Sequence, residues 1–373
     1  MKYCKRCVNP STRPTIVFDE EGVCVVCRFQ EKKQANLIDW EARRLELEGI
    51  AAWGREHTSC SYDCIVAVSG GKDSTRQALH VRDVLGLKPL LVSMVYPPEQ
   101  LHERGAHNLS NLISLGFDAV TVSLNPQIWK KLMRESHFRW ANWCRSTELA
   151  LYALPIHFAI AYGIPLVFLG ENPTYTVGET EGPQGGEANG MQYCNTLAGG
   201  SAAKFLMDGV TEQDLYFYNY PPESDVGKAG IRIIYLGYYI EDFNSFRNAE
   251  IAGAHGLRFR EAPPEDTGEF TGTQSLDEEF FIVNQMIKHV KYGYGAVTDK
   301  AIEAMNVGLL TRDQAVELIR KYDGKCHPRY IESYCRYIGI TEQEFWDVVE
   351  ASRGQDVWER DASGQWVLKA NIE

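Results

Sequence analysis

The stretch SGGKDS, residues 69–74, brings together residue types that can hold a phosphate group. Gly70 and Gly71 permit a tight turn through which backbone amides approach an anion closely. Ser69 and Ser74 flank these glycines and add hydroxyl donors. An apolar run precedes the stretch and a helical pattern follows it, so the positive end of that helix would face the same ligand. We therefore predict an anion site. The alternative is a plain strand–helix turn in which the glycines serve only the backbone geometry.

Lys72 and Asp73 lie inside this stretch and carry opposite charges. Lys72 supplies a cation for phosphate oxygens. Asp73 would repel a phosphate by itself, so we interpret it as a ligand of Mg²⁺ that bridges to those oxygens. The spacing Gly-x4-Gly-Lys-Ser/Thr of a Walker A loop is absent.

A second group of residues has the spacing of a metal site. Cys4-x2-Cys7 is followed, after 16 intervening residues, by Cys24-x2-Cys27. Two such pairs complete a tetrahedral site of four thiolates, which is typical of a structural Zn²⁺ ribbon because no position stays open for catalysis. An iron–sulfur cluster would use the same ligands, and four unrelated reduced cysteines are the remaining alternative.

The elements that must position these residues follow from the pattern of apolar runs. Strands alternate with helices between residues 62 and 236, which predicts a doubly wound parallel α/β sheet with ligands beyond the carboxyl ends of its strands. The expected strands are 62–68, 89–96, 119–124, 164–169 and 231–236, and the helices between them are 73–85, 102–115, 126–137 and 147–162. Residues 277–292, 311–322 and 341–352 predict a helical C-terminal region in which Thr311-x2-Gln314 and Thr341-x2-Glu344 form capping boxes.

Other candidates lie beside the expected ligand edge. Glu171 follows the fourth expected strand and would bind Mg²⁺ or orient a substrate, or simply cap a turn. We also assign Ala67, Met94 and Gly170 to the nucleotide-binding set. The glycine-rich segment 174–200 is long for a connection, which favours a lid over the site, with disorder as the alternative.

Aromatic residues and further cysteines have two interpretations each. Stacking on a sugar or base is less favoured than core packing for three tryptophans, namely Trp129, Trp140 and Trp143. The tyrosine-rich pieces YGYG (292–295) and RYIESYCRYIG (329–339) offer contact area for a partner or a second copy in a homo-oligomer. Small-hydrophobe packing is favoured over metal or thiol chemistry for Cys326 and Cys335.

Composition narrows the classes of function. The chain has 373 residues and a net charge of −12, which argues against a broad nucleic-acid surface. No apolar run approaches the about 20 residues of a membrane span, and the start of the chain lacks the apolar region of a signal peptide. We therefore expect a cytoplasmic protein that binds neither membrane nor nucleic acid, in which disulfides are rare.

The stretch SGGKDS resembles the PP-loop of ATP pyrophosphatases, which cleave ATP between the α- and β-phosphates. Four segments in order, MKYCKRCVNPSTRPTIVFDEEGVCVVC (1–27), SGGKDS, LGENP (169–173) and KYGYGAVTDKAIEAMNVGLLTRDQAVELIRKYDG (291–324), resemble N-acetyl sugar amidotransferases. The resemblance implies bacterial surface-polysaccharide or flagellin-glycan synthesis, in which ATP activates an acyl group of a nucleotide-linked or free sugar and ammonia then enters. A basic stretch that we expected before Arg247 reads EDFNSF here, while Arg247 and Asn248 remain.

The resemblance completes the predicted assignments. We expect a zinc ribbon with a helical connector in residues 1–50, a PP-loop domain in 58–260 and a helical region in 261–373. Lys72, Asp73, Glu171 and Arg247 form the catalytic set. Arg247 would pair with a diphosphate or carboxylate, and a surface role is the equal alternative for it. ATP, Mg²⁺ and Zn²⁺ are the expected cofactors, and a nucleotide sugar is the expected substrate.

The source of ammonia is predicted to lie outside this chain. A triad-type glutaminase needs an exposed cysteine at a strand–helix elbow, together with a distant His and a carboxylate. That setting is lacking at Cys144, Cys194, Cys326 and Cys335. A separate glutaminase subunit is therefore expected. The alternatives are a tRNA-modifying PP-loop enzyme, disfavoured by the acidic charge, and a sulfurtransferase that carries a persulfide on Cys144 or Cys194.

Overall fold

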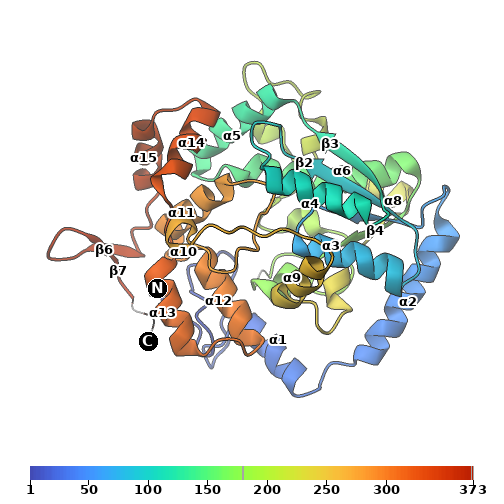
Figure 1. The fold of residues 1–373 in the computed structure, drawn as a ribbon, viewed down its shortest axis with the longest axis horizontal. Coiled ribbons are helices and arrows are strands. Elements are labelled where there is room, and N and C mark those ends of the chain that lie inside the picture. Colours follow the sequence, from blue (N-terminus) through green and yellow to red (C-terminus); the bar gives the residue numbers. More distant parts are fainter. Residues whose placement is uncertain (179, 371, 373) are drawn as a thin grey trace.

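Short apolar runs form a five-stranded sheet at the centre of the protein (Figure 1). The computed structural model describes residues 1–178, 180–370 and 372. The strands are β1 (Cys64–Ala67), β2 (Pro89–Val95), β3 (Asp118–Ser123), β4 (Leu166–Leu169) and β5 (Arg232–Tyr235). Their order is β3-β2-β1-β4-β5 and each neighbouring pair is parallel, so all five carboxyl ends meet at one edge. The predicted parallel sheet is confirmed.

Successive strand residues point into two different cores, as the period of a strand requires. On β1, Ile65 joins one apolar core, whereas Cys64 and Val66 join the other. On β4, Val167 and Phe168 divide in the same way. Both faces of the sheet are therefore covered, which explains why its strands read as continuous apolar runs.

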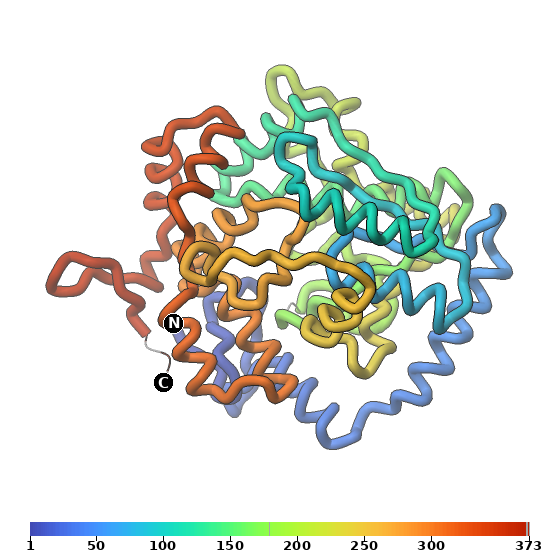
Figure 2. The backbone as a smooth tube through the Cα atoms, in the orientation of Figure 1, coloured from blue at the N-terminus to red at the C-terminus, as the bar shows by residue number. Residues whose placement is uncertain are grey.

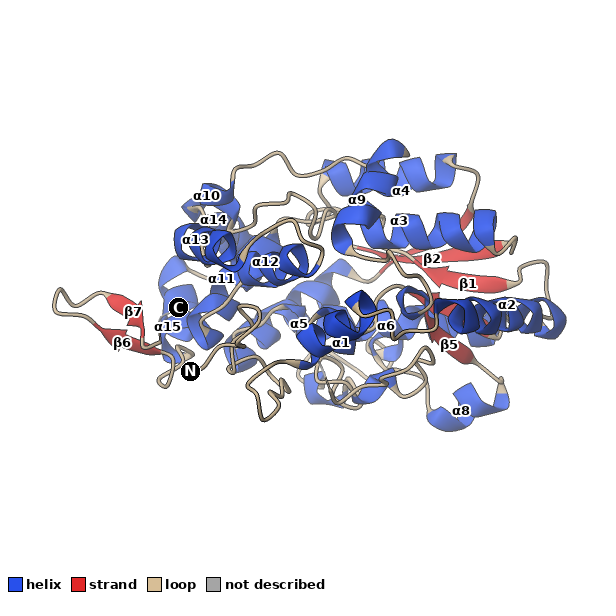
Figure 3. Ribbon diagram, turned by 90° about the horizontal axis from the view of Figure 1, so that it is seen from below, coloured by secondary structure: helices blue, strands red, loops and turns tan. Residues whose placement is uncertain are grey.

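Helices cover both faces of this sheet (Figure 3). One face carries α2 (Trp40–His57), α3 (Lys72–Leu79) with a π-helical extension (His80–Val84), α4 (Glu103–Ser114) and, packed on α3, α9 (Ser245–Ala254). The other face carries α5 (Pro126–Trp140) and α6 (Cys144–Tyr162). Short helices in the connections are α7 (Pro173–Thr176), α8 (Glu223–Lys228) and four 3₁₀ turns, namely Met191–Tyr193, Ala203–Phe205, Tyr216–Tyr218 and Leu236–Tyr238. The expected doubly wound arrangement is thus present.

The C-terminal region is helical, as predicted, and lies at one end of the sheet (Figures 1 and 3). Its elements are α10 (Pro264–Thr267), α11 (Phe280–Tyr292), α12 (Ala296–Asn306), α13 (Arg312–Tyr322), α14 (Pro328–Ile338), α15 (Glu342–Ala351) and a hairpin of β6 (Trp358–Arg360) and β7 (Trp366–Leu368). Both predicted capping boxes are present, at the starts of α13 and α15. We did not predict α12 or α14 as separate helices.

The N-terminal segment, with α1 (Val25–Gln34), lies beside α12 and α13 rather than alone (Figures 1 and 2). Cys4, Cys7 and Val26 share one apolar core with Val297 and Ile319 of those helices. A second core joins strand residues of the sheet to α11, α14 and α15. The apolar cores therefore cross both expected domain boundaries.

Several tyrosines of the tyrosine-rich pieces pack inside the chain. Tyr294 is buried, and on α14 the side chains of Tyr330 and Tyr334 pack in the core formed with the sheet region. These side chains attach α14 to the rest of the chain, while contact of the pieces with a partner stays a prediction. Among the described residues, no helix is both long and apolar enough to cross a bilayer.

Candidate active site

The loop between β1 and α3 has the geometry that the sequence predicts for an anion site. Gly70 has φ of 77°, and a Cβ there would lie 3.2 Å from the backbone nitrogen of Leu109, so glycine is required. Gly71 is the N-cap of α3 and provides no side-chain cap. The Ser74 hydroxyl donates to the Gly71 carbonyl at 3.2 Å and holds the turn closed. Backbone amides at the start of α3 thus remain available to a ligand.

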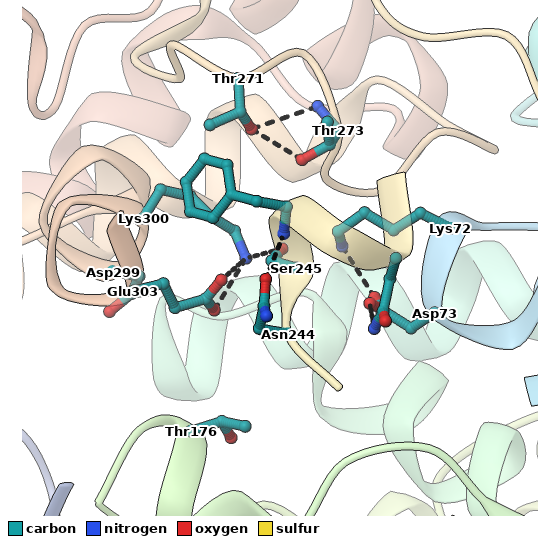
Figure 4. A network of polar contacts seen from close by, with 12 residues as sticks. Lys72, Asp73, Thr176, Asn244, Ser245, Thr271, Thr273, Asp299, Lys300 and Glu303 are labelled. Atoms are coloured by element: carbon teal, nitrogen blue, oxygen red, sulfur yellow. Dashed lines mark hydrogen bonds and ion pairs between the residues drawn. The ribbon is translucent and has the colours of Figure 1, made fainter. Parts of the chain in front are cut away.

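Lys72 and Asp73 form an ion pair at the start of α3 (Figure 4). Lys72 Nζ donates to Asp73 Oδ2 at 2.7 Å, and Asn248 Nδ2 on α9 donates to Asp73 Oδ1 at 2.8 Å. Burial acts to raise the pKa of Asp73, but the charges of Lys72 and Lys300 and the bond from Asn248 outweigh it and lower this pKa. Asp73 is therefore held as a carboxylate.

Helix α12 brings a second cation to this place from the C-terminal region. Lys300 Nζ donates to the Ser245 hydroxyl at 2.7 Å and to both Glu303 carboxylate oxygens at 2.9 Å (Figure 4). Burial acts to lower the pKa of Lys300, but the negative charges of Glu303, Glu171 and Asp73 raise it above its usual value. Lys300 is thus a permanent buried cation next to the loop carboxylates.

Glu171, just past β4, carries the proton that is most easily moved in this cluster. Burial first, and then the negative charges of Asp73 and Glu303, raise its pKa from 4.5 to about 7, although the charges of Lys300 and Lys72 oppose the shift. A carboxyl group with this pKa is balanced between its two forms near neutral pH. Binding of a cation beside it would favour the carboxylate.

A cavity of about 370 Å³, here called the main cavity, opens beyond the carboxyl ends of the strands. The predicted site residues among its lining are Ala67, Ser69, Asp73, Ser74, Met94, Gly170 and Glu171. Gly70, Gly71 and Lys72 belong to the same loop but do not line the cavity, and Lys72 reaches it through Asp73. Two carboxylates on one wall fit Mg²⁺, which usually takes one or two protein carboxylates and completes its shell with water and phosphate oxygens.

The structure does not bring Arg247 to this cavity. Its side chain is 45% exposed on α9, and it pairs with Asp242 at 3.3 Å and Glu250 at 2.6 Å. The next residue, Asn248, points inward instead and bonds Asp73. One step along a helix turns a side chain by about 100°, so only one of two neighbours can face the site. In this geometry Arg247 does not line the main cavity, which favours a surface role over a catalytic one.

Three residues at the site were missed from the sequence, namely Asn248, Lys300 and Glu303. Asn248 follows the noticed arginine, and its amide is oriented by Arg76, which donates to Asn248 Oδ1 at 3.1 Å. The i,i+3 spacing of Lys300 and Glu303 signals only an exposed helical ion pair. Nothing local indicates that α12 turns this pair toward the loop.

The glycine-rich segment after β4 forms one wall of the main cavity. Thr176, Val177, Met191, Cys194 and Thr196 line it. Parts of the segment pair with β5, since Ala188 N donates to Ile233 O at 2.6 Å and Tyr235 N donates to Gly186 O at 2.8 Å. The segment thus covers the site, while its opening as a lid stays a prediction. Residue 179 lies outside the described residues.

The tryptophans of α5 and the turn after it serve packing rather than stacking on a ligand. Trp129 and Trp143 are each 1% exposed in the core, and their indole nitrogens donate to Gln100 Oε1 and the Phe280 carbonyl. Trp140 packs partly buried against the same core. Core packing was the favoured interpretation, and the structure agrees with it.

The four paired cysteines converge at a separate, closed place. Their sulfur atoms all lie within 4.8 Å of one another, with 3.9 Å between Cys4 and Cys27 and 3.7 Å between Cys7 and Cys24. Four thiolates about 2.3 Å from a zinc ion lie about 3.8 Å apart in a tetrahedron, so these distances fit Zn²⁺. The side chains are buried, and Arg312 on α13 donates to the Cys4 and Cys7 carbonyls.

Comparison with known proteins finds a family model that is similar to the C-terminal part of the chain. Residues 265–372, which include α11 to α15 and the hairpin, match the family described as LPS biosynthesis protein WbpG-like, C-terminal domain. This match agrees with the resemblance noted in the sequence. Among solved structures, NMN synthetase from Francisella tularensis shows 14% identity and a TM-score of 0.36, over 80% of this chain and 96% of that chain. No curated protein matches the chain significantly.

Proposed function

We propose that this chain is an ATP-dependent amidotransferase of bacterial surface-glycan synthesis, such as O-antigen synthesis. It adenylates an acyl oxygen of a nucleotide-linked N-acetyl sugar or uronic acid and replaces that oxygen with ammonia, releasing AMP and pyrophosphate. The observation that carries the proposal is the meeting of Lys72, Asp73, Glu171 and Lys300 beside an uncapped, glycine-led helix start at the main cavity. The family match of residues 265–372 supports the sugar-related part.

The residues divide the chemistry as follows. An acyl oxygen is a poor leaving group, and its transfer to the α-phosphate converts it into part of AMP, which leaves readily. Lys72 and the amides at the start of α3 would hold the phosphates and stabilise the charge of the departing pyrophosphate. Asp73 and Glu171 would hold Mg²⁺, which when bound neutralises charge on phosphate oxygens.

Lys300 has a different proposed task. It is buried, and it is fixed by Ser245 and Glu303 rather than by the loop. Its charge offsets the repulsion between Asp73, Glu171 and Glu303, so the carboxylates can share one wall before Mg²⁺ and ATP arrive. Helix α12 thereby couples the C-terminal region to nucleotide binding.

The nitrogen is proposed to come from a separate glutaminase subunit. Free ammonia is mostly protonated at neutral pH, and delivery by a protein contact keeps it unprotonated and concentrated. The chain alone should therefore use high ammonium at alkaline pH and respond poorly to glutamine. Efficient use of glutamine by the chain alone would contradict this part of the proposal.

The test of the whole proposal is the identity of the nucleotide products. The chain, ATP, Mg²⁺, ammonium and candidate UDP-sugars are incubated, and the products are resolved by chromatography and mass. AMP and pyrophosphate should form only when acceptor is present, with a product whose mass reports an oxygen replaced by nitrogen. ADP as the nucleotide product would contradict the proposal.

A sulfurtransferase is the second candidate, because Cys194 lines the main cavity. Cys144 fits this role poorly, since burial raises the pKa of its thiol well above the usual value and disfavours the reactive thiolate. Cys194→Ala should leave ammonium-dependent turnover intact if the chain is an amidotransferase. Loss of that turnover with folding preserved would favour sulfur transfer.

A further inference from the structure

A second cavity adjoins the main cavity. Residues of the N-terminal segment, of the sheet region and of the C-terminal region line it. It measures about 350 Å³ and is here called the basic cavity. Arg13 comes from the N-terminal cysteine segment, Arg145 from α6, and Lys288 and Lys291 from α11. The two cavities share Val177 and Thr196 in their linings, so they are separated only by the segment that follows β4.

The acidic residues of the basic cavity are already neutralised in part. Asp299 accepts from Lys288 Nζ at 2.6 Å and also pairs with Arg13. Burial acts to raise the pKa of Asp299, but Lys288 and Arg13 outweigh it and hold this pKa below its usual range. Among the described residues of the lining, Glu148 is the other acidic residue, against four basic ones. The lining therefore carries an excess of positive charge.

Arg145 and Lys291 are the two basic residues of the lining that do not pair with Asp299. Arg145 Nε is buried and has no hydrogen-bond partner among the described residues. Lys291 Nζ donates to the Trp140 carbonyl at 2.7 Å, and its pKa is lowered to about 8 by burial and then by the charge of Arg145. Two cations that repel each other in a partly buried place favour the binding of an anion between them.

The start of α6 adds to the same field. Ala141 has φ of 45°, and this left-handed residue ends α5 so that α6 begins at once with Cys144. The first turn of α6 holds no acidic residue, and Asn142 Oδ1 accepts from the Cys144 amide at 3.0 Å. Ala141, Asn142 and Arg145 line the basic cavity, so the positive end of a 19-residue helix lies at its wall. Gln285 adds a buried Oε1 that has no hydrogen-bond partner among the described residues and can accept from a hydroxyl or amide of a ligand.

We propose that the basic cavity holds the anionic group of the acyl acceptor, a sugar-linked diphosphate or a sugar carboxylate, and presents the acyl group to the main cavity. This inference rests on the proposed function, because it names the class of acceptor for the same reaction. Arg145 and Lys291 are the residues that recognise the anion. A neutral sugar would leave the net positive charge of the described lining uncompensated, and this favours an anionic acceptor.

The arrangement also gives the cysteine cluster a role at the substrate. Arg13 Nε donates to Asn9 Oδ1 at 2.7 Å, and the Asn9 amide donates to Cys7 Sγ at 3.4 Å. The metal-binding segment therefore positions a cation of the basic cavity through two hydrogen bonds. Metal loss should weaken the binding of the acceptor before the fold as a whole is lost.

Equilibrium binding tests the proposal on the full chain with its bound metal. The main cavity is first saturated with Mg²⁺ and α,β-methylene-ATP, which cannot be cleaved between its α- and β-phosphates. Calorimetry then measures UDP, which has the diphosphate without a sugar, glucuronate, which has the carboxylate without phosphate, and N-acetylglucosamine, which has neither. The variants are Arg145→Gln, Lys291→Gln and, as a control, Arg336→Gln on α14, where the side chain is 72% exposed.

Each variant should weaken one anionic probe by about 10- to 100-fold, the effect of losing one hydrogen bond to a charged group. A loss for UDP identifies the diphosphate as the bound group, and a loss for glucuronate identifies the carboxylate. The affinity of each variant for N-acetylglucosamine and for α,β-methylene-ATP should stay within about twofold of that of the unaltered chain. The control variant should also bind both anions within about twofold. Unchanged binding of the ATP analogue also shows that the variants fold.

Three results would overturn the proposal. Neither anion binds the unaltered chain, or both anions bind the variants as tightly as the unaltered chain, or the ATP analogue weakens as much as the anions. Failure of the proposed function looks different. Arg145-dependent anion binding would persist while ADP, or no acceptor-dependent AMP, is formed.

Discussion

The cysteine cluster and the main cavity both gather charged or ionisable ligands, but they are built in opposite ways. The four sulfur atoms already lie at the distances of a filled tetrahedron and are sealed by apolar neighbours and by Arg312. At the main cavity, Asp73 and Glu171 share a wall with no such closure, and the pKa of Glu171 is raised to about 7. The cluster is complete without a substrate, whereas the cavity is arranged for ligands that bring both charge and oxygen atoms.

This difference separates a stabilising site from a reacting one. Metal binding at a closed site contributes to the free energy of folding, and this contribution is lost when a ligand residue is removed. An open site holds like-charged carboxylates close together by means of scaffold residues such as Lys300 and Asn248, and this arrangement favours the binding of a cation. Variants of the two regions should therefore divide cleanly between stability and turnover.

The largest expected effect is on stability, in the cysteine cluster. Cys24→Ser should abolish stoichiometric zinc, measured by elemental analysis, and lower the free energy of unfolding by at least about 5 kcal/mol, because structural zinc contributes on the order of 10 kcal/mol in small domains. Cys60→Ser is the matched control, since Cys60 is an exposed free cysteine outside the cluster. Full zinc retention in Cys24→Ser would contradict the assignment of the cysteine cluster as a structural zinc site.

The next effect is on turnover, in the main cavity. Asp73→Asn should lower kcat by about 10²–10³-fold, since a charged group that positions the reacting phosphates is lost. The zinc content and the thermal transition should change little. Asp83→Asn is the control, because that carboxylate is half exposed and pairs only with Arg82. An equal loss of turnover in both variants would remove Asp73 from the site.

Lys300→Met tests whether the C-terminal region completes the open site. Loss of this charge-assisted bonding should lower kcat/KM for ATP about 10- to 100-fold. Lys321→Met, on the exposed side of α13, should leave kcat/KM unchanged. Activity of Lys300→Met equal to that of the control would show that α12 only packs against the loop.

The pH dependence of Mg²⁺–ATP binding tests the raised pKa of Glu171. Because the carboxylate is the form that holds a cation, affinity should rise about tenfold from pH 6 to pH 8, and Glu171→Gln should remove this slope. The stability of the chain without ligand should have the opposite pH dependence. A raised carboxyl pKa stabilises the folded chain below about 4.5, and that contribution is lost as the pH rises through about 7. If the affinity of Glu171→Gln for Mg²⁺–ATP still rises with pH, another titrating group causes the pH dependence.

The smallest effect is expected at Arg247. Its ion pairs are exposed, so Arg247→Ala should change kcat/KM by less than about twofold. Its neighbour offers the contrast, because Asn248→Ala removes the bond to Asp73 and should cost about tenfold. A large loss of kcat/KM in Arg247→Ala with little loss in Asn248→Ala would contradict the orientation of α9, in which Asn248 and not Arg247 faces the site.

Local patterns were enough to predict the parts of the molecule that local chemistry determines. The cysteine spacing, the glycine pair before Lys72 and the apolar runs of β1 and β2 each carry their own signal within a few residues. The capping boxes of α13 and α15 are equally local.

What could not be predicted depends on partners distant in the chain. Helix α12 is capped by Asp323, whose carboxylate accepts from Gly295 N at 2.8 Å, Val297 N at 3.0 Å and the Thr298 hydroxyl at 2.6 Å. No cap is visible before α12, so both that helix and its Lys300 were missed. Helix α11 likewise begins at Phe280, later than expected, where Glu278 accepts the amide of Phe281 at 2.8 Å.

The central claim is that the open site transfers an acyl oxygen to the α-phosphate of ATP. An acceptor labelled with ¹⁸O at that acyl oxygen tests it directly, with ammonium as the nitrogen source and mass analysis of the nucleotide product. Adenylation followed by attack of ammonia at carbon leaves the acyl oxygen on phosphorus, so AMP should carry one ¹⁸O per turnover. Unlabelled AMP, or label in inorganic phosphate with ADP as the nucleotide product, would contradict the claim.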